Sequence, residues 1–114
     1  MNKSGLSLRI DLPDGSRFGP GKATLLRTLQ HTGSIKSAAN SLGMSYPRAL
    51  KLIEQMNSAF ADPVVETRHG GAEGGGTQLT DSGREILTLY EKICSDASDV
   101  NRDAIIQMKT YLSE

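Results

Sequence analysis

The 114-residue sequence has one cysteine, no tryptophan and few aromatic side chains, and its formal net charge is zero. A lone cysteine, Cys94, cannot form an internal disulfide, which excludes a disulfide framework and indicates a reducing compartment. No apolar run approaches the roughly 18 to 20 residues that a membrane-spanning helix needs, and the N-terminus lacks the pattern of a signal peptide. We therefore expect a single-domain, soluble, cytoplasmic protein that makes no contact with membranes.

The residues that carry chemistry form no catalytic or metal-binding pattern. The two histidines, one cysteine and scattered carboxylates have no nucleophile–base or ligand spacing. His31 falls in the last turn of a predicted helix, where partial positive charge is favourable, so we assign it a structural role. We expect no enzyme, no metal site and no cofactor.

The zero net charge hides an uneven distribution of charge along the chain. Residues 1–84 hold ten basic and seven acidic side chains, which leaves three and six of the 13 of each sign for residues 85–114. From Gly15 to Ile53 there are six Lys or Arg and no Asp or Glu. A solvated helical surface usually mixes signs, so this stretch favours a polyanion as its partner.

Residues 33–57 have the pattern of two short helices joined by a turn. Ser34 is a predicted N-cap, and Gly43 supplies the left-handed conformation that ends the first helix. Ser45 caps the second helix, with Pro47 in its first turn. The predicted buried stripes are Ile35, Ala38, Ala39 and Leu42 on the first helix, and Tyr46, Ala49, Leu50, Ile53, Met56 and Phe60 on the second. This is the sequence form of a helix-turn-helix, although an ordinary helical hairpin has the same spacing.

Two elements precede this unit. Residues 6–12 alternate apolar and polar side chains, residues 13–16 are typical of a turn, and Arg17-Phe18 begins a return strand. We predict a β-hairpin that covers one side of a helical core and has no functional role. Pro20-Gly21 is interpreted as a break, followed by a support helix from Lys22 to Thr32 that Gly33 ends.

A glycine-rich hairpin follows the second helix. Residues 64–68 favour a strand, residues 69–76 contain five glycines, and residues 77–79 return to an extended pattern. A phosphate-binding loop would require G-x-x-x-x-G-K-[ST] before a helix, and a dinucleotide fold would require a crossover helix and a downstream acid. Neither is present, so residues 64–79 are predicted to form the wing of a winged helix.

The last predicted helix begins at a cap supplied by Thr80 or Asp81. Apolar residues then recur at steps of 4, 3, 4, 3 and 4, which is the seam that packs one helix against another. This seam is the predicted dimer interface, and it consists of Ile86, Tyr90, Ile93, Ala97, Val100 and Ala104. The alternative is a terminal helix folded onto its own domain. Residues 95–99 are poor helix formers, which predicts a bend or break there.

Two blocks of sequence resemble a known family. HTGSIKSAANSLGMSYPRALKLIEQMN at 31–57, followed by VVETRHGGAEGGGTQLTDSGREILTLY at 64–90, is similar to the N-terminal DNA-binding domain of molybdate-responsive ModE regulators, a winged-helix module of LysR type. The resemblance covers roughly residues 20 to 95. It implies a homodimeric transcription factor whose recognition helix enters the major groove while its wing lies near the backbone or minor groove.

The resemblance also has departures. Family members have Lys and Ser where this chain has Pro47 and Arg48, and Trp where it has Leu50, so the DNA sequence recognised is expected to differ. The family's molybdate site lies in a C-terminal domain, whereas this sequence ends at Glu114. We therefore expect no molybdate binding by the family's route.

These inferences define a mainly α fold with little β structure. It is a winged helix-turn-helix at 1–80, with an N-terminal β-hairpin and a long dimerisation helix at 81–114. Its expected partners are double-stranded DNA and a second copy of the chain, on an inverted-repeat operator. The predicted base reader is Arg48, with Lys51 reaching a base or a phosphate, and Lys22 assisting on the backbone. The full predicted DNA-binding set is Ser34, Lys36, Ser45, Tyr46, Pro47, Arg48, Lys51, Arg68, His69, Gly70 and Gly71. A winged-helix module that binds another regulator is the alternative function, and Arg48 with Lys51 favours DNA over it.

Overall fold

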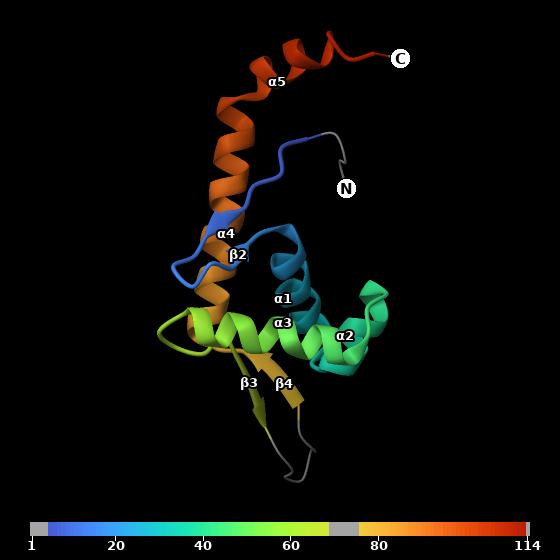
Figure 1. Ribbon diagram of the computed structural model, residues 1–114, viewed down its shortest axis with the longest axis vertical. Helices are drawn as coiled ribbons and strands as arrows, with labels where there is room; N and C mark the ends of the chain where they lie inside the picture. Colours follow the sequence, from blue (N-terminus) through green and yellow to red (C-terminus); the bar gives the residue numbers. More distant parts are fainter. Residues whose placement is uncertain (1–4, 69–75, 114) are drawn as a thin grey trace.

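A computed structural model describes residues 5–68 and 76–113, and Figure 1 shows a small helical body from which one long helix projects. The helices are α1 (Pro20–Thr32), α2 (Ile35–Leu42), α3 (Tyr46–Ala59), α4 (Asp81–Val100) and α5 (Arg102–Lys109). The strands form two antiparallel hairpins, β1 (Ile10–Asp11) with β2 (Arg17–Phe18), and β3 (Val65–Arg68) with β4 (Gly76–Leu79). This arrangement confirms the predicted winged helix-turn-helix with a long C-terminal helix.

The helix-turn-helix is set by caps that lie within a few residues of each helix end. The Ser34 hydroxyl accepts from the Ser37 N–H at 3.1 Å, and the Ser45 hydroxyl accepts from the Arg48 N–H at 3.2 Å. Gly33 and Gly43 end α1 and α2 with φ of 70° and 68°, a conformation that favours glycine. These local features confirm the predicted start and end of α2 and the predicted start of α3.

The start of α1 differs from the prediction. Pro20 and Gly21 were interpreted as a break before the helix, and they are its first two residues. Proline is tolerated there because the first N–H of a helix has no intrahelical partner. The core then forms where α1, α2 and α3 pack together, and its largest fully buried side chains include Leu25, Leu26 and Leu29 of α1.

The N-terminal hairpin is shorter than predicted, with two residues in each strand, and it covers one side of the core. Phe18 is buried and meets Phe60 and Tyr90 edge-on, with ring centroids 6.3 Å and 5.1 Å apart. The Tyr90 hydroxyl donates to the Leu8 carbonyl at 2.7 Å. One α4 side chain therefore holds the hairpin and the segment before it.

We expect Tyr90→Phe to cost about 1 kcal/mol at neutral pH, because it removes that hydrogen bond and leaves the ring in place. Burial raises the pKa of Tyr90 to about 12. The folded state therefore favours the neutral, protonated hydroxyl of Tyr90. The contribution of this preference to the free energy of unfolding is complete below the unfolded pKa of about 10 and is lost as pH rises toward 12. Urea unfolding between these pH values should show a shallower loss of stability in Tyr90→Phe than in the wild type. The exposed Tyr111→Phe is the matched control, and an identical pH dependence in all three proteins would contradict the assignment.

The wing hairpin is attached to the helical body by backbone contacts and by one asparagine. The Thr77 N–H donates to the Gly33 carbonyl at 2.9 Å, which joins β4 to the end of α1. Near the end of α3, the Asn57 amide oxygen accepts from the N–H groups of Val64 and Val65, at 2.8 Å and 3.2 Å. Its amide nitrogen donates back to the Val65 carbonyl at 3.3 Å. Asn57 therefore fixes the wing relative to α3.

The two halves of α4 lie in different surroundings. Gly83, Leu87 and Tyr90 in its first half are buried in the core, whereas its second half and α5 rise away from the body (Figure 1). The predicted interruption at residues 95–99 is wrong in position, because α4 runs unbroken through them to Val100 and α5 starts at Arg102. Ion pairs at Lys92–Asp96 and Asp99–Arg102 bridge successive turns across this stretch.

Candidate nucleic-acid interface

Helix α3 presents a continuous exposed ridge on the side opposite its buried face. Ala49, Ile53 and Met56 are buried against the core. Helix periodicity then places Pro47 and Lys51 at the centre of the opposite face, and both are exposed. Within the part of the chain that the structure describes, Lys51 has no ion-pair partner. This ridge is the surface of α3 that can enter a groove.

Arg48 lies on one flank of that ridge, in the first turn of α3. It is exposed and faces the N-terminal hairpin, where it lines a hollow together with Arg9, Arg17 and Lys22. Lys51 therefore has the more central position, while Arg48 stands at the edge nearest the hairpin. Both side chains project from the N-terminal half of the helix, which is the half that reaches base edges in helix-turn-helix proteins.

The opposite flank of α3 faces the wing across a groove of about 440 Å³. Ser34 and Lys36 from α2, Tyr46 from α3 and Arg68 from β3 line it. Tyr46 is 48% exposed, so its place in the buried stripe of α3 was wrong, and the ring lies in this groove. The Ser34 oxygen caps α2 while its hydroxyl can still donate to an anion.

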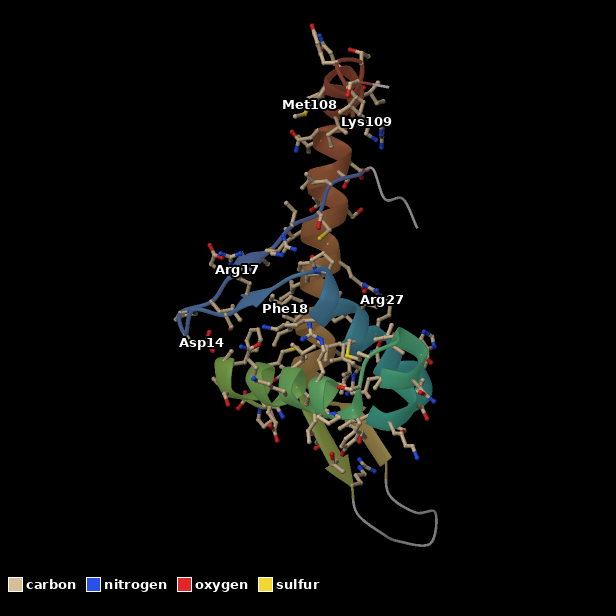
Figure 2. The ribbon with its side chains drawn as sticks, turned by 45° about the vertical axis from the view of Figure 1, so that its right-hand side comes forward. Asp14, Arg17, Phe18, Arg27, Met108 and Lys109 are labelled. Atoms are coloured by element: carbon tan, nitrogen blue, oxygen red, sulfur yellow. The ribbon has the colours of Figure 1, made fainter. Side chains whose placement is uncertain are left out.

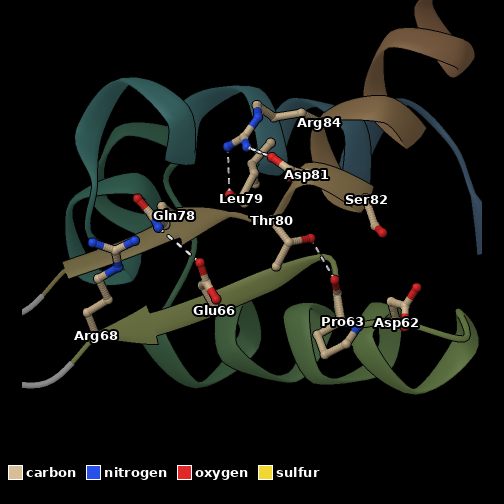
Figure 3. A pocket seen from close by; sticks show the side chains of 10 residues that line it. All are labelled: Asp62, Pro63, Glu66, Arg68, Gln78, Leu79, Thr80, Asp81, Ser82 and Arg84. Atoms are coloured by element: carbon tan, nitrogen blue, oxygen red, sulfur yellow. Dashed lines mark hydrogen bonds and ion pairs between the residues drawn. The ribbon is translucent and has the colours of Figure 1, made fainter.

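The base of the wing is fixed by hydrogen bonds from side chains of the wing and of the start of α4 (Figure 3). Gln78 donates to Glu66 at 2.9 Å, and the Thr80 hydroxyl donates to the Pro63 carbonyl at 2.7 Å. Arg84 donates to the Leu79 carbonyl at 2.9 Å and pairs with Asp81. Arg68 makes no such contact with the side chains drawn in Figure 3, so its guanidinium remains available to a ligand. His69, Gly70 and Gly71, which were also predicted to contact DNA, lie outside the described residues.

The cations of residues 15–53 separate into two groups. Arg27 on α1 pairs with Glu91 on α4 at 2.8 Å, and Arg17 pairs with Asp11 across the hairpin at 3.4 Å; Figure 2 labels both arginines. Among the described residues, the other four cations, Lys22, Lys36, Arg48 and Lys51, have no carboxylate partner. The uncompensated positive charge therefore lies on and beside the helix-turn-helix.

Residues 22–84, more than half of the chain, match the model of bacterial regulatory helix-turn-helix proteins of the lysR family, and they include the helix-turn-helix and both strands of the wing. The chain belongs to this family. Its helix-turn-helix is accordingly the DNA-binding part of a transcriptional regulator, and the family is one of regulators rather than enzymes.

Several curated relatives are similar to this LysR-type domain. The molybdenum-pterin-binding protein MopB of Rhodobacter capsulatus is 39% identical over 79 residues, which cover 69% of this chain and 29% of MopB. The molybdenum transport protein ModE of Azotobacter vinelandii is 36% identical over 86 residues, covering 75% and 32% of the two chains. The transcriptional regulator ModE of Yersinia pestis is 34% identical over 97 residues, covering 82% and 37%. The chain thus spans about a third of the length of these relatives.

The structure places the predicted dimer residues of this LysR-type chain in two environments. Tyr90 is buried in its own core, which removes it from the exposed seam because its ring is already enclosed. Ile86 and Ala97 are half-buried, Ile93 is 46% exposed, and Ala104 is exposed. Val100 is 83% exposed, and Leu89, which was not predicted, is 48% exposed.

Within the described chain, no helix is long and apolar enough to cross a bilayer.

Several residues that shape this surface were not predicted from the sequence. Asn57 and Gly83 position the wing and α4, and Arg9 and Arg17 lie beside Arg48. Asn57 could have been recognised as an Asn at a helix end before an extended run. No local pattern marks Gly83, because Gly21 also lies in the first turn of a helix and a Cβ there would meet no atom within 4 Å. The position of the arginines depends on how the hairpin folds over α1, and no local pattern indicates it.

Proposed function

We propose that this chain reads DNA sequence through α3 and acts as a homodimer on an inverted-repeat operator. The observation that supports this most is the exposed ridge of Pro47 and Lys51, flanked by Arg48 and set beside a wing. A major groove about 12 Å wide accepts an α-helix about 10–12 Å across. A bacterial regulator of this kind works where the chromosome is, in the cytoplasm.

The groups around α3 are proposed to position the protein on phosphates. The N-termini of α2 and α3 carry Ser34 and Ser45 as caps, and helix N-termini favour phosphate oxygens. Lys36 and Arg68 add positive charge on the wing side. Such contacts fix register and orientation without carrying sequence information.

The homodimer is proposed from an apolar row that continues beyond the body of the protein. Leu89, Ile93, Ala97 and Val100 follow one face of α4, and Ile106, Met108, Tyr111 and Leu112 extend the exposed apolar surface to the C-terminal end. The radius of gyration is 16.5 Å, whereas a compact domain of this length has about 13 Å, which reflects the projecting helix. Residues 81–114 are therefore proposed as the dimerisation element, with the first half of α4 shared with the DNA-binding core.

A dimer of this form places two recognition helices in successive major grooves on one face of DNA. Half-sites are then expected about 34 Å apart, centre to centre. Selection of bound fragments from genomic DNA tests this, and the fragments retained should share an inverted repeat with that spacing. Added molybdate should leave the selected sites unchanged, because none of the proposed contacts involves it. A single half-site in the selected DNA would contradict the dimeric arrangement.

Arg48→Ala is expected to cost about 1–3 kcal/mol on the selected site and to relax preference at one base pair per half-site, because the guanidinium fork can bind guanine O6 and N7 together. Lys36→Ala is the matched control, since loss of a phosphate contact weakens all sequences alike and lowers the salt slope by about one. Competition binding on selected and mixed-sequence duplexes measures both effects. If Arg48→Ala keeps the wild-type ratio between the two duplexes, Arg48 is not the reader, and Lys51→Ala becomes the decisive variant.

A further inference from the structure

A second basic surface lies on the flank of α3 that faces away from the wing. It is a hollow of about 410 Å³ between the N-terminal hairpin, the start of α1 and the first turns of α3. Four cationic side chains line it, namely Arg9 from the segment before β1, Arg17 from β2, Lys22 from α1 and Arg48 from α3. We name it the hairpin hollow.

The cations of the hairpin hollow are held in place by the fold. Arg9 packs closely over the backbone at Gly19, where a Cβ would lie 2.8 Å from the Arg9 Cγ. The Lys22 ammonium donates to the Arg17 carbonyl at 2.7 Å, which ties α1 to β2. These contacts keep the stems packed while the charged groups line the hollow.

The carboxylates of the hairpin only partly offset this charge. Asp11 pairs with Arg17 at 3.4 Å. Asp14 lies in the hairpin turn, where the Ser16 hydroxyl and N–H donate to it at 2.6 Å and 2.9 Å and lower its pKa. Within the described residues, Arg9, Lys22 and Arg48 have no ion-pair partner, and burial lowers the pKa of Lys22 despite the nearby Asp14. An anion in the hollow would therefore meet net positive charge.

The position of the hollow indicates which anion it fits. A helix in the major groove has one DNA backbone on each side, because the groove is only about as wide as the helix. The groove with Ser34, Lys36 and Arg68 lies on one flank of α3, and the hairpin hollow, bordered by Met44, Arg48 and Leu52, lies on the other. The two surfaces thus stand where the two strands would pass.

We propose that the hairpin hollow contacts the phosphates of the DNA strand that borders α3 on the side away from the wing. The N-terminal hairpin then acts as a second positioning element, in addition to its role in covering the core. Together with the wing it holds α3 between two backbones. This inference rests on the proposed binding of α3 in the major groove.

The test compares two double variants of the 114-residue chain that remove the same charge. Arg9→Gln with Lys22→Gln removes two cations of the hairpin hollow, and Lys92→Gln with Arg102→Gln removes two from α4 and α5. Affinity for a mixed-sequence duplex is measured between about 50 and 200 mM salt. The slope of log K against log salt should be smaller by about 1.8 in the first variant, at about 0.9 for each lost contact, and unchanged in the second. Thermal unfolding followed by circular dichroism establishes that each variant is folded. If the first double variant is not folded, Arg9→Gln alone replaces it, and the expected decrease of the salt slope is then about 0.9.

The outcomes separate this inference from the proposed function. An unchanged slope in a folded hairpin variant, with a smaller slope in Lys36→Ala, would overturn the hairpin contact and leave the wing-side contacts standing. An equal decrease of the salt slope in both double variants would show a general effect of charge, and it would also overturn the hairpin contact. If the wild type does not bind DNA at all, the proposed function itself fails. Arg9→Lys with Lys22→Arg keeps both charges and should retain the wild-type slope.

Discussion

Gly83→Ala is expected to reduce the free energy of unfolding by about 3 kcal/mol, at the upper end of the cost of overpacking. A Cβ at this position would lie 2.1 Å from the Val64 carbonyl oxygen and 2.9 Å from its carbonyl carbon. These neighbours are backbone atoms, so relief requires α4 to move away from the start of the wing. The same carbonyl accepts from the Thr80 N–H at 3.0 Å, so the movement also weakens the N-terminal anchor of α4. Alanine's helix propensity offsets only about 1 kcal/mol of this cost.

The matched control is Gly21→Ala in the first turn of α1. A Cβ there meets no atom within 4 Å, so alanine should leave stability unchanged or raise it by up to about 1 kcal/mol. Urea unfolding of the wild type and the two variants measures the difference. A Gly83→Ala protein as stable as the wild type would show that α4 does not approach the Val64 backbone this closely.

The second large effect is expected from Ile93→Asp, which should convert the proposed dimer to monomers at micromolar concentration. Ile93 is 46% exposed in the single chain and lies in the apolar row with Leu89, Ala97 and Val100. Burying an unpaired carboxylate in a helix–helix seam costs at least a few kcal/mol, which is a loss of at least a hundredfold in association. Light scattering should give a mass of two chains for the wild type and one for the variant.

Ser95→Asp provides the control for charge on the same helix. Ser95 is exposed, and helix periodicity places it opposite the apolar row, so this variant should stay dimeric. Ile93→Asp should also keep its helical circular dichroism, because the core residues of α4 are Gly83, Leu87 and Tyr90. A wild-type mass of one chain would exclude the dimer and, with it, the inverted-repeat operator.

Local chemistry explains which elements were predictable from the sequence. Gly33, Ser34, Gly43 and Ser45 act on helix ends within a few residues, so the end of α1, both ends of α2 and the start of α3 could be predicted from them. Thr80, one of two predicted caps for α4, is the one that accepts from the Gly83 N–H, at 2.9 Å. The wing followed from a glycine-rich segment between two β-prone runs.

Tertiary contacts explain the features that the sequence did not show. The Tyr90 hydroxyl reaches the Leu8 carbonyl 82 residues away, and this is why a residue of the predicted seam is buried in its own domain. Residues 95–99 remain helical although their propensity is poor, and the exposed local pairs Lys92–Asp96 and Asp99–Arg102 add only about 0.2–0.5 kcal/mol each. Pro20 was predicted to break the chain, and it is instead the first residue of α1, a position where proline costs no hydrogen bond.

The same distinction holds for the candidate site. The exposure of Lys51 and Arg48 followed from helix periodicity, since the buried residues of α3 define its free face. The grouping of Arg9, Arg17 and Lys22 beside Arg48 required the fold of the N-terminal hairpin over α1. Only the structure therefore shows that Arg48 faces the N-terminal hairpin and its cations.

The most direct test of the central claim, that α3 reads DNA sequence, is a titration of the 114-residue chain against a selected genomic fragment and a mixed-sequence duplex. It is carried out at two salt concentrations, because phosphate contacts make both affinities depend on salt. We expect the selected fragment to bind at least about a thousandfold more tightly than the mixed-sequence duplex at physiological salt. Equal affinity for both duplexes at both salt concentrations would contradict the claim and would favour a winged-helix module that binds another regulator.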